Sequence, residues 1–295
     1  MYDIIIIGMG PAGISAAIYL KRSNLKVLIL EKSAPGGLLN TIDKIENYPG
    51  FSSITGPDLA YQMLLQIKEN AIDYRTEEVI DIKNQDLKII TTTKNEYKTA
   101  NIIIASGRVA KTLNLDQERA LIGRGISTCA ICDGFFYKNK DIAIVGGGNS
   151  ALQEALYLSK IVKNITILIR SSQLKAEDNL IQKVKQTSNI NILYNSQITA
   201  LKTENDKLAG IEINNKEILE VAGVFVYIGY NPNNNFVLAE VKRDNKGYLK
   251  VNNNYETNIK GIYAIGSAID IAENQIVTAC ATGAIVALHI AKNNK

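Results

Sequence analysis

Residues 2–13 read YDIIIIGMGPAG, and this run sets the architecture of the chain. The β-branched stretch at 2–7 predicts a fully buried parallel strand. Residues 14–22 are predicted to form a helix, and the apolar run at 26–30 is predicted to be a second strand that ends at Glu31. Strand, glycine-rich turn, helix and strand together make one βαβ unit with two parallel strands.

The three glycines of this turn have separate steric reasons. Gly8 makes the tight turn, Gly10 lets a pyrophosphate approach the backbone, and Gly13 lets the helix pack closely on the strand. The helix N-terminus offers free N–H groups to phosphates. At the end of the second strand, the Glu31 carboxylate can accept hydrogen bonds from ribose hydroxyls. The turn therefore predicts a dinucleotide site.

A second unit of the same kind follows at residues 141–151, which read DIAIVGGGNSA. A helix is predicted over 152–161 and a strand over 165–169, after which comes Arg170 instead of an acid. An arginine there suits a 2′-phosphate, and Ser171 and Lys175 add a donor and a charge. This favours NADPH over NADH. The alternative is that Arg170 is a solvated surface residue.

The remaining elements indicate an α/β fold with two Rossmann-like, three-layer dinucleotide-binding domains, the second inserted into the first. A helix is predicted at 60–70, strands at 97–105 and 261–266, a loop at 231–235 and a long apolar helix at 275–291. Because that last helix can complete the first domain, we expect domains at 1–112 with 237–295 and at 113–236.

The stretch CAICDG at residues 129–134 lies just before the second unit. Its C-x-x-C spacing brings two sulfurs within disulfide reach, and such pairs cycle readily between thiol and disulfide. A zinc site or a pair of inert buried thiols are the alternatives. Asp133 is either a turn residue or the general acid that protonates a leaving thiolate. Cys280 is predicted to lie in the core and His289 at the surface.

Composition narrows the function further. Apolar residues make up 46% and charged residues 21%, values typical of a globular protein, and the net charge of +4 argues against a dedicated nucleic-acid surface. One histidine leaves no basis for a His-rich metal centre. With neither a membrane-spanning apolar run nor a signal peptide expected, three cysteines point to the cytoplasm.

Taken together, these motifs resemble the low-molecular-weight, bacterial-type thioredoxin reductases, a branch of the pyridine nucleotide-disulfide oxidoreductases. The resemblance covers essentially the whole chain and implies FAD in the first domain and NADPH in the second. The FAD contacts that it implies are Gly8, Gly10, Pro11, Ala12, Gly13, Glu31, Gly36, Gly37, Leu38, Asn47, Val79, Gly107, Gly266, Ser267, Gln275 and Ile276. The NADPH contacts are Gly146, Gly148, Asn149, Ser150, Ala151, Arg170, Ser171 and Lys175.

The resemblance also implies the order of electron transfer. Hydride passes from the nicotinamide to the flavin, and electrons then reach a Cys129–Cys132 disulfide. Cys132 is implied to face the flavin, Cys129 to attack the disulfide of thioredoxin or a thioredoxin-like protein, and Asp133 to act as the acid. The two domains are implied to rotate between these steps, and the protein is implied to be a homodimer.

Several positions depart from the pattern of that family. Ser171 and Lys175 stand where the family has arginines, which leaves NADH as an alternative donor. Leu38, Ser267 and Asn274 replace a glutamine, an aspartate and an arginine, so we expect weaker hydrogen bonding to FAD. These changes motivate two alternative functions, a disulfide reductase fed by ferredoxin or flavodoxin and a flavin-binding redox sensor without steady turnover.

Overall fold

The structure is a computed structural model that describes residues 1–42, 44–271 and 274–293, without the side chain of residue 132. The chain divides into two compact units. The first unit comprises Met1–Val109 and Asn231–Lys295, and the second comprises Ala110–Tyr230. Both crossings lie slightly N-terminal to the boundaries predicted at 112/113 and 236/237. The assignment of a nucleotide to each unit stays a prediction.

The first unit is built on one sheet with the strand order β3-β2-β1-β6-β5-β4, in which β17 also pairs with β6. The pairs of β1, β2, β3, β6 and β17 are parallel, while β4, β5 and β6 form an antiparallel meander. The bounds are β1 Tyr2–Ile7, β2 Val27–Glu31, β3 Asp73–Thr76, β4 Val79–Lys83, β5 Lys88–Thr92, β6 Glu96–Ile104 and β17 Ile262–Ala264. The predicted strand at residues 2–7 is confirmed.

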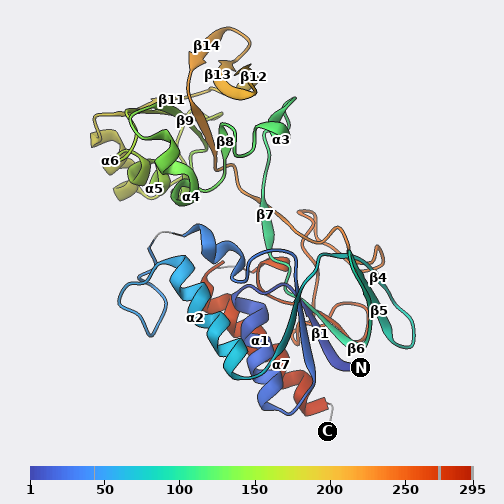
Figure 1. The fold of residues 1–295 in the computed structure, drawn as a ribbon. Helices are drawn as coiled ribbons and strands as arrows, with labels where there is room; N and C mark the ends of the chain where they lie inside the picture. Colours follow the sequence, from blue (N-terminus) through green and yellow to red (C-terminus); the bar gives the residue numbers. More distant parts are fainter. Residues whose placement is uncertain (43, 272–273, 294–295) are drawn as a thin grey trace. The chain divides into compact units, whose positions relative to one another are not determined.

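Three helices pack on one face of this sheet: α1 Pro11–Arg22, α2 Gly56–Glu69 and α7 Ile276–Asn293 (Figure 1). The helix α1 begins at Pro11, three residues before the predicted start at Ile14. Proline suits this position because its ring presets a helical φ and the first turn needs no N–H from it. The helix therefore starts directly at the glycine turn, where its free N–H groups are available.

The opposite face of the sheet is covered by the chain between β16, Tyr230–Pro232, and α7. Val237, Val241 and Leu249 are buried there against strand residues such as Ile5 and Ile102. Two short 3₁₀ segments, η1 Gly37–Thr41 and η3 Gly266–Ala268, complete the unit. This return of residues 231–295 to the first sheet is the feature that makes the first unit discontinuous in sequence.

The second unit has a five-stranded parallel sheet with the order β11-β10-β9-β15-β8. One face packs on α5 Asn149–Leu158 and α6 Asp178–Gln186, and the other lies under a three-stranded antiparallel sheet (Figure 1). The bounds are β8 Ile126–Ser127, β9 Asp141–Val145, β10 Asn164–Leu168, β11 Ile190–Leu193, β12 Ile198–Glu204, β13 Lys207–Ile213, β14 Glu217–Glu220 and β15 Gly223–Val226. The remaining helical segments are α3 Glu118–Leu121, α4 Ala130–Asp133 and η2 Gly134–Tyr137.

Each of the two chain crossings between the units is a short strand, β7 Arg108–Ala110 and β16 Tyr230–Pro232, and the two strands pair with each other. The prediction of a loop over residues 231–235 is therefore wrong for its first two residues. Asparagine and proline are turn-forming residues, but proline is tolerated in a short edge strand of this kind.

Candidate active site

The first glycine turn has the geometry of a pyrophosphate cradle. Gly8 directly follows β1 with φ +106°, and a Cβ atom at this position would overlap the carbonyl oxygen of Ala105, which directly follows β6. Gly10 precedes α1, and a Cβ built on it would meet no described atom within 4 Å. The space in front of the helix N-terminus is therefore open on the side where phosphates are bound in such turns.

The acid at the end of β2 lies beside this turn. Glu31 is only 8% exposed, and its carboxylate accepts hydrogen bonds from the backbone N–H groups of Met9 at 2.7 Å and Ser33 at 3.0 Å. Both bonds tie the acid to the glycine turn and to the residue following the strand. A carboxylate has about four acceptor positions, so Glu31 keeps capacity for ribose hydroxyls.

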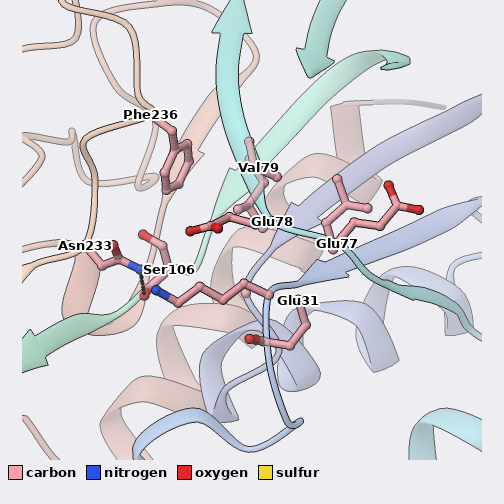
Figure 2. A pocket seen from close by; sticks show the side chains of 11 residues that line it. Glu31, Glu77, Glu78, Val79, Ser106, Asn233 and Phe236 are labelled. Carbon is pink, nitrogen blue, oxygen red and sulfur yellow. Dashed lines mark hydrogen bonds between the residues drawn. The ribbon is translucent and has the colours of Figure 1, made fainter. Parts of the chain in front are cut away.

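A hollow lies beside Glu31 and Gly8. We call it the first hollow, and Figure 2 shows its lining residues, among which the Glu77 side chain points away from Ser106 and Asn233. The Ser106 Oγ atom in it is buried and has no hydrogen-bond partner among the described residues. An unsatisfied buried hydroxyl at the wall of a hollow fits a bound polar ligand. The labelled lining residues are Glu31, Glu77, Glu78, Val79, Ser106, Asn233 and Phe236.

Residues that the sequence placed far apart also gather at the first turn. The backbone N–H of Gly36 donates to Met9 O at 2.8 Å, and a Cβ on Gly37 would lie 3.6 Å from the Cα of Gly10. A Cβ on Gly266 would come within 2.8 Å of the Cβ of Ala12. Leu38 follows in η1, and Gly107 O accepts from the backbone N–H of Asn233 at 3.0 Å.

The polar residues at the start of α7 are paired with one another. Asn47 Nδ2 donates to Gln275 Oε1 at 3.2 Å, and Ser267 Oγ donates to Asn274 Oδ1 at 2.8 Å. Ile276 is the first residue of α7. The two substituted positions, Ser267 and Asn274, thus contact each other, an arrangement that the sequence pattern did not indicate.

The second glycine turn repeats the backbone geometry of the first. Gly146 directly follows β9 with φ +139°, and a Cβ there would overlap the carbonyl oxygen of Tyr227. Gly148 precedes α5, which starts with Asn149 and Ser150, and Ala151 is fully buried under the helix. The turn is held by a bond from the backbone N–H of Lys175 to Gly147 O at 2.7 Å.

A second hollow lies beside this turn and includes Gly146, Arg170, Lys111 and Ser196. Arg170 follows β10 and is exposed, so its guanidinium is accessible to a ligand. The Ser171 Oγ proton is already donated to Gln173 O at 2.7 Å, which leaves that hydroxyl only as an acceptor. Lys111 was missed in the sequence because it stands in the crossing strand region, far from the motif.

Residues 129–134, which we call the redox stretch, follow β8 in the sheet that also carries the second glycine turn. Cys129 is disulfide-bonded, whereas Cys280 is a free thiol. The side chain of Cys132 lies outside the described residues, so its pairing with Cys129 stays a prediction. The Cys129 backbone is held by its N–H bond to Ser127 Oγ at 3.0 Å and by Asp133 N–H donating to its carbonyl at 3.2 Å.

Asp133 ends the helical turn α4 beside two tyrosines. Burial raises the pKa of Tyr137, and the negative charge of Asp133 raises it further. The same carboxylate contributes to the raised pKa of Tyr227, again after the effect of burial. The acid is therefore close to both phenols at the redox stretch, which is compatible with its predicted role in proton transfer.

Two aromatic side chains beside the redox stretch were not identified as functional in the sequence. Phe135 and Phe136 are 72% and 73% exposed, although large aromatic side chains are usually buried. They lie in η2, directly after Asp133 and Gly134. A usable signal existed, since two adjacent phenylalanines in a single turn cannot both point into the same core.

The other candidate groups have more ordinary surroundings. Cys280 is half-buried between Pro11 O, which its Sγ contacts at 3.7 Å, and the Tyr48 hydroxyl at 4.0 Å, and burial raises the pKa of its thiol. His289 Nε2 lies 3.1 Å from the Asn293 amide. Within the described ranges, no group of three His, Cys, Asp or Glu side chains is arranged to hold a metal ion.

Comparison with known proteins agrees with this geometry. The sequence profile described as "Pyridine nucleotide-disulphide oxidoreductase" matches residues 2–283. Thioredoxin reductase of Bacillus subtilis is 36% identical, with 97% of this chain and 93% of that protein covered. Thioredoxin reductase of Ureaplasma parvum is 39% identical, with 100% and 98% covered.

A solved structure extends the agreement to the fold. Lactococcus lactis thioredoxin reductase has a TM-score of 0.91 and 35% identity, with 99% of this chain and 98% of that chain covered. The α/β fold class with two Rossmann-like units is confirmed. The chain belongs to the pyridine nucleotide-disulphide oxidoreductase family and, within it, to the bacterial-type thioredoxin reductases.

Proposed function

We propose that the chain reduces the disulfide of thioredoxin, or of a thioredoxin-like protein, with electrons from NADPH that pass through FAD and a Cys129–Cys132 disulfide. Membership of the family makes it a flavin-dependent disulfide reductase acting on thioredoxin. The observation that carries the finer proposal is that the disulfide-bonded Cys129 and the second glycine turn both follow strands of one parallel sheet. Ligands of such sheets bind at the carboxyl ends of the strands.

The residues of the first turn fit FAD. The open space at Gly10, the unsatisfied Ser106 hydroxyl and the buried Glu31 carboxylate suit a pyrophosphate and a ribose. Bound FAD would supply a carrier that accepts two electrons at once and returns them to the disulfide. Gly36, Gly37, Gly266, Gln275 and Ile276 surround the start of α1 and α7 and are the contacts we assign to the remainder of the cofactor.

The second turn supports NADPH as the donor. Arg170 is exposed at the second hollow, and Lys175 is anchored to Gly147 by its backbone, which leaves its ammonium group accessible. Two cations at this edge favour a 2′-phosphate over a bare hydroxyl. Asn149 and Ser150 at the start of α5 complete the phosphate-binding helix end.

The protein partner is assigned to the surface of the redox stretch. In this assignment Cys129 attacks the partner disulfide, Cys132 faces the flavin, and Asp133 protonates the leaving thiolate. Phe135 and Phe136, which follow the redox stretch in the chain, provide an exposed apolar surface for this contact. Exposed aromatic side chains of this kind are common anchors of protein interfaces.

We also assign a homodimer, with the helix face of the first unit as its interface. Five large apolar side chains on α1, α2 and α7 are between 41% and 56% exposed: Tyr19, Tyr61, Val277, Ile285 and Leu288. The helix α7 has the length and hydropathy of a membrane span, and 28% of its apolar stretch is buried. However, its Gly283 packs against the backbone of α1, as in a helix of a folded domain. A second copy of the chain would cover this face. We also assign the protein to the cytoplasm.

The proposal is tested by Cys129→Ser in the FAD-loaded protein. The variant should still reduce its flavin with NADPH but should lose the reduction of thioredoxin by at least about a thousandfold, because the attacking sulfur is gone. Cys280→Ser is the matched control and should retain turnover. Thioredoxin reduction by Cys129→Ser at the wild-type rate would contradict the assigned route, and an FAD-loaded wild type that no nicotinamide reduces would favour a protein electron donor.

A further inference from the structure

One tyrosine connects the end of a strand in the second unit's parallel sheet to the redox stretch. Tyr227 directly follows β15, and its hydroxyl accepts a hydrogen bond from the backbone N–H of Ala130 at 3.0 Å. Ala130 is the residue after Cys129, and 97 residues of chain separate the two partners. The bond therefore reaches into the C-x-x-C turn from outside it.

The amide that Tyr227 receives has particular need of a partner. Ala130 is 0% exposed and is the first residue of α4, a helical turn of four residues. The first N–H groups of a helix have no intrahelical acceptor, and leaving one buried and unpaired is unfavourable. A single turn has little stability of its own. The Tyr227 hydroxyl thus stabilises this turn by a hydrogen bond from outside it.

The hydroxyl stays neutral over the whole working pH range. Burial raises the pKa of Tyr227 above its ordinary value, and the negative charges of Glu154 and Asp133 raise it further. A neutral phenol keeps the lone pairs that accept the Ala130 N–H and adds no charge beside the disulfide.

The backbone of the same residue holds the second glycine turn. The Tyr227 N–H donates to Val145 O at 2.8 Å, and the Tyr227 carbonyl lies so close to Gly146 that a Cβ there would overlap it. One residue therefore contacts both the turn that we assign to the nicotinamide nucleotide and the turn that carries the disulfide.

We propose that Tyr227 is a positioning residue that sets the redox equilibrium of the Cys129 disulfide by holding the Ala130 amide in place. This inference rests on the function proposed above. Reduction adds two electrons and two protons to the disulfide, which breaks the S–S bond and leaves two thiols. Because the hydrogen bond is formed while Cys129 is disulfide-bonded, it stabilises the oxidised turn. Two free thiols release the turn from the S–S constraint, so it can relax if the bond is lost.

The variant Tyr227→Phe keeps the ring and removes only the acceptor. The unpaired amide then raises the free energy of the oxidised turn more than that of the relaxed dithiol. We expect the thiol–disulfide equilibrium constant to shift about threefold to tenfold toward the dithiol, the range of a lost hydrogen bond. A tenfold shift corresponds to about 30 mV, in the less negative direction, for this two-electron couple.

The test equilibrates the FAD-loaded, full-length protein without oxygen in dithiothreitol buffers of fixed redox ratio. Free thiols are then alkylated, and the mass of the peptide that contains residues 129–132 gives the oxidised fraction. Tyr194→Phe, at the opposite edge of the same sheet, is the matched control and should leave the midpoint unchanged. A shift of Tyr227→Phe toward the dithiol supports the inference, while an unchanged or opposite midpoint overturns it.

Two further readouts separate this inference from other failures. If the wild-type peptide does not titrate as a two-electron couple, the proposed function itself fails. If Tyr227→Phe lowers the overall stability, the difference in melting temperature between its oxidised and reduced forms still reports the equilibrium. That difference should be smaller in the variant than in the wild type, and an equal difference would overturn the role of Tyr227.

Discussion

The two glycine turns share one backbone design and differ in the side chain that completes it. Gly8 and Gly146 both directly follow a central strand at positive φ, and both fit against the backbone of a neighbouring strand end with no room for a Cβ. At the end of the following strand the first unit has Glu31, which is 8% exposed and accepts two backbone N–H groups, whereas the second has Arg170 just after the strand, which is exposed. In the proposed function, the shared backbone binds phosphates in both turns, and the side chain at the end of the second strand selects the nucleotide.

The surroundings extend this contrast. The first hollow is lined by Glu31, Glu78 and one cation, Lys32, and the second is lined by Lys111 and Arg170. An additional phosphate would be repelled at the acidic site and attracted at the basic one. We therefore expect the charge of these side chains to distinguish the two proposed dinucleotide sites.

The largest expected effect comes from placing a side chain on either turn glycine. Gly8→Val should abolish FAD retention, because the added atoms overlap Ala105 O and force a β-branched residue to positive φ. Gly146→Val should retain FAD and lose flavin reduction by NADPH. The ratio of flavin to protein absorbance and anaerobic flavin reduction distinguish the two. Loss of FAD in Gly146→Val would contradict the independence of the two turns.

Gly10→Ala should weaken FAD binding without loosening the fold. The added Cβ would meet no described protein atom within 4 Å and the backbone φ of −81° is ordinary, so the apoprotein should keep its melting temperature within a few degrees. The same methyl group occupies the space assigned to the pyrophosphate, so the Kd for FAD should rise about tenfold or more. Fluorescence titration of apoprotein with FAD measures this, and an unchanged Kd would place the cofactor elsewhere.

Arg170→Glu tests the difference between the two strand ends by placing an acid at the second, as Glu31 is placed at the first. The KM for NADPH should rise about tenfold to a hundredfold, since a charge-assisted hydrogen bond of about 1.5–3 kcal/mol is lost. The KM for NADH should stay equal or fall, because a carboxylate there can accept from the ribose 2′-OH. Equal effects on both donors would mean that Arg170 does not read the 2′-phosphate.

The smallest effect concerns the pH dependence of the first unit. Burial acts to raise the pKa of Glu77, but hydrogen bonds from Thr92, Asn95 and Tyr97 outweigh it and lower that pKa below its ordinary value. The ionised Glu77 carboxylate therefore stabilises the folded state fully above its unfolded pKa near 4.3, and this stabilisation is lost as the pH falls through its lower pKa in the folded state. Glu77→Gln should reduce the free energy of unfolding by about 2 kcal/mol at pH 7. In urea unfolding, this difference should shrink below about pH 4; a constant difference would refute it.

The sequence was most informative where a pattern is local. The strands at 2–7 and 141–145 and both glycine turns follow from residues that are neighbours in the chain. The helix start at Pro11 was misplaced because the glycine-rich run hides it, although proline is favoured at a first helical position.

The long-range parts of the site were not predictable in the same way. Asn233 and Phe236 line the first hollow only because the chain returns to the first sheet after the second unit. The Tyr227–Ala130 hydrogen bond joins the segments that follow two neighbouring parallel strands, β15 and β8. Neither contact leaves a periodic signal, since each depends on which strand ends meet after folding.

The central claim is that a nicotinamide nucleotide bound at the second glycine turn reduces FAD bound at the first, and that FAD then reduces the disulfide. Anaerobic stopped-flow absorbance tests this claim most directly. The FAD-loaded protein is mixed with NADPH and, separately, with NADH, and the flavin band near 450 nm is followed. The account predicts rapid bleaching by NADPH, slower bleaching by NADH, and recovery of the band when oxidised thioredoxin is added. No bleaching by either nucleotide, with FAD bound, would contradict it.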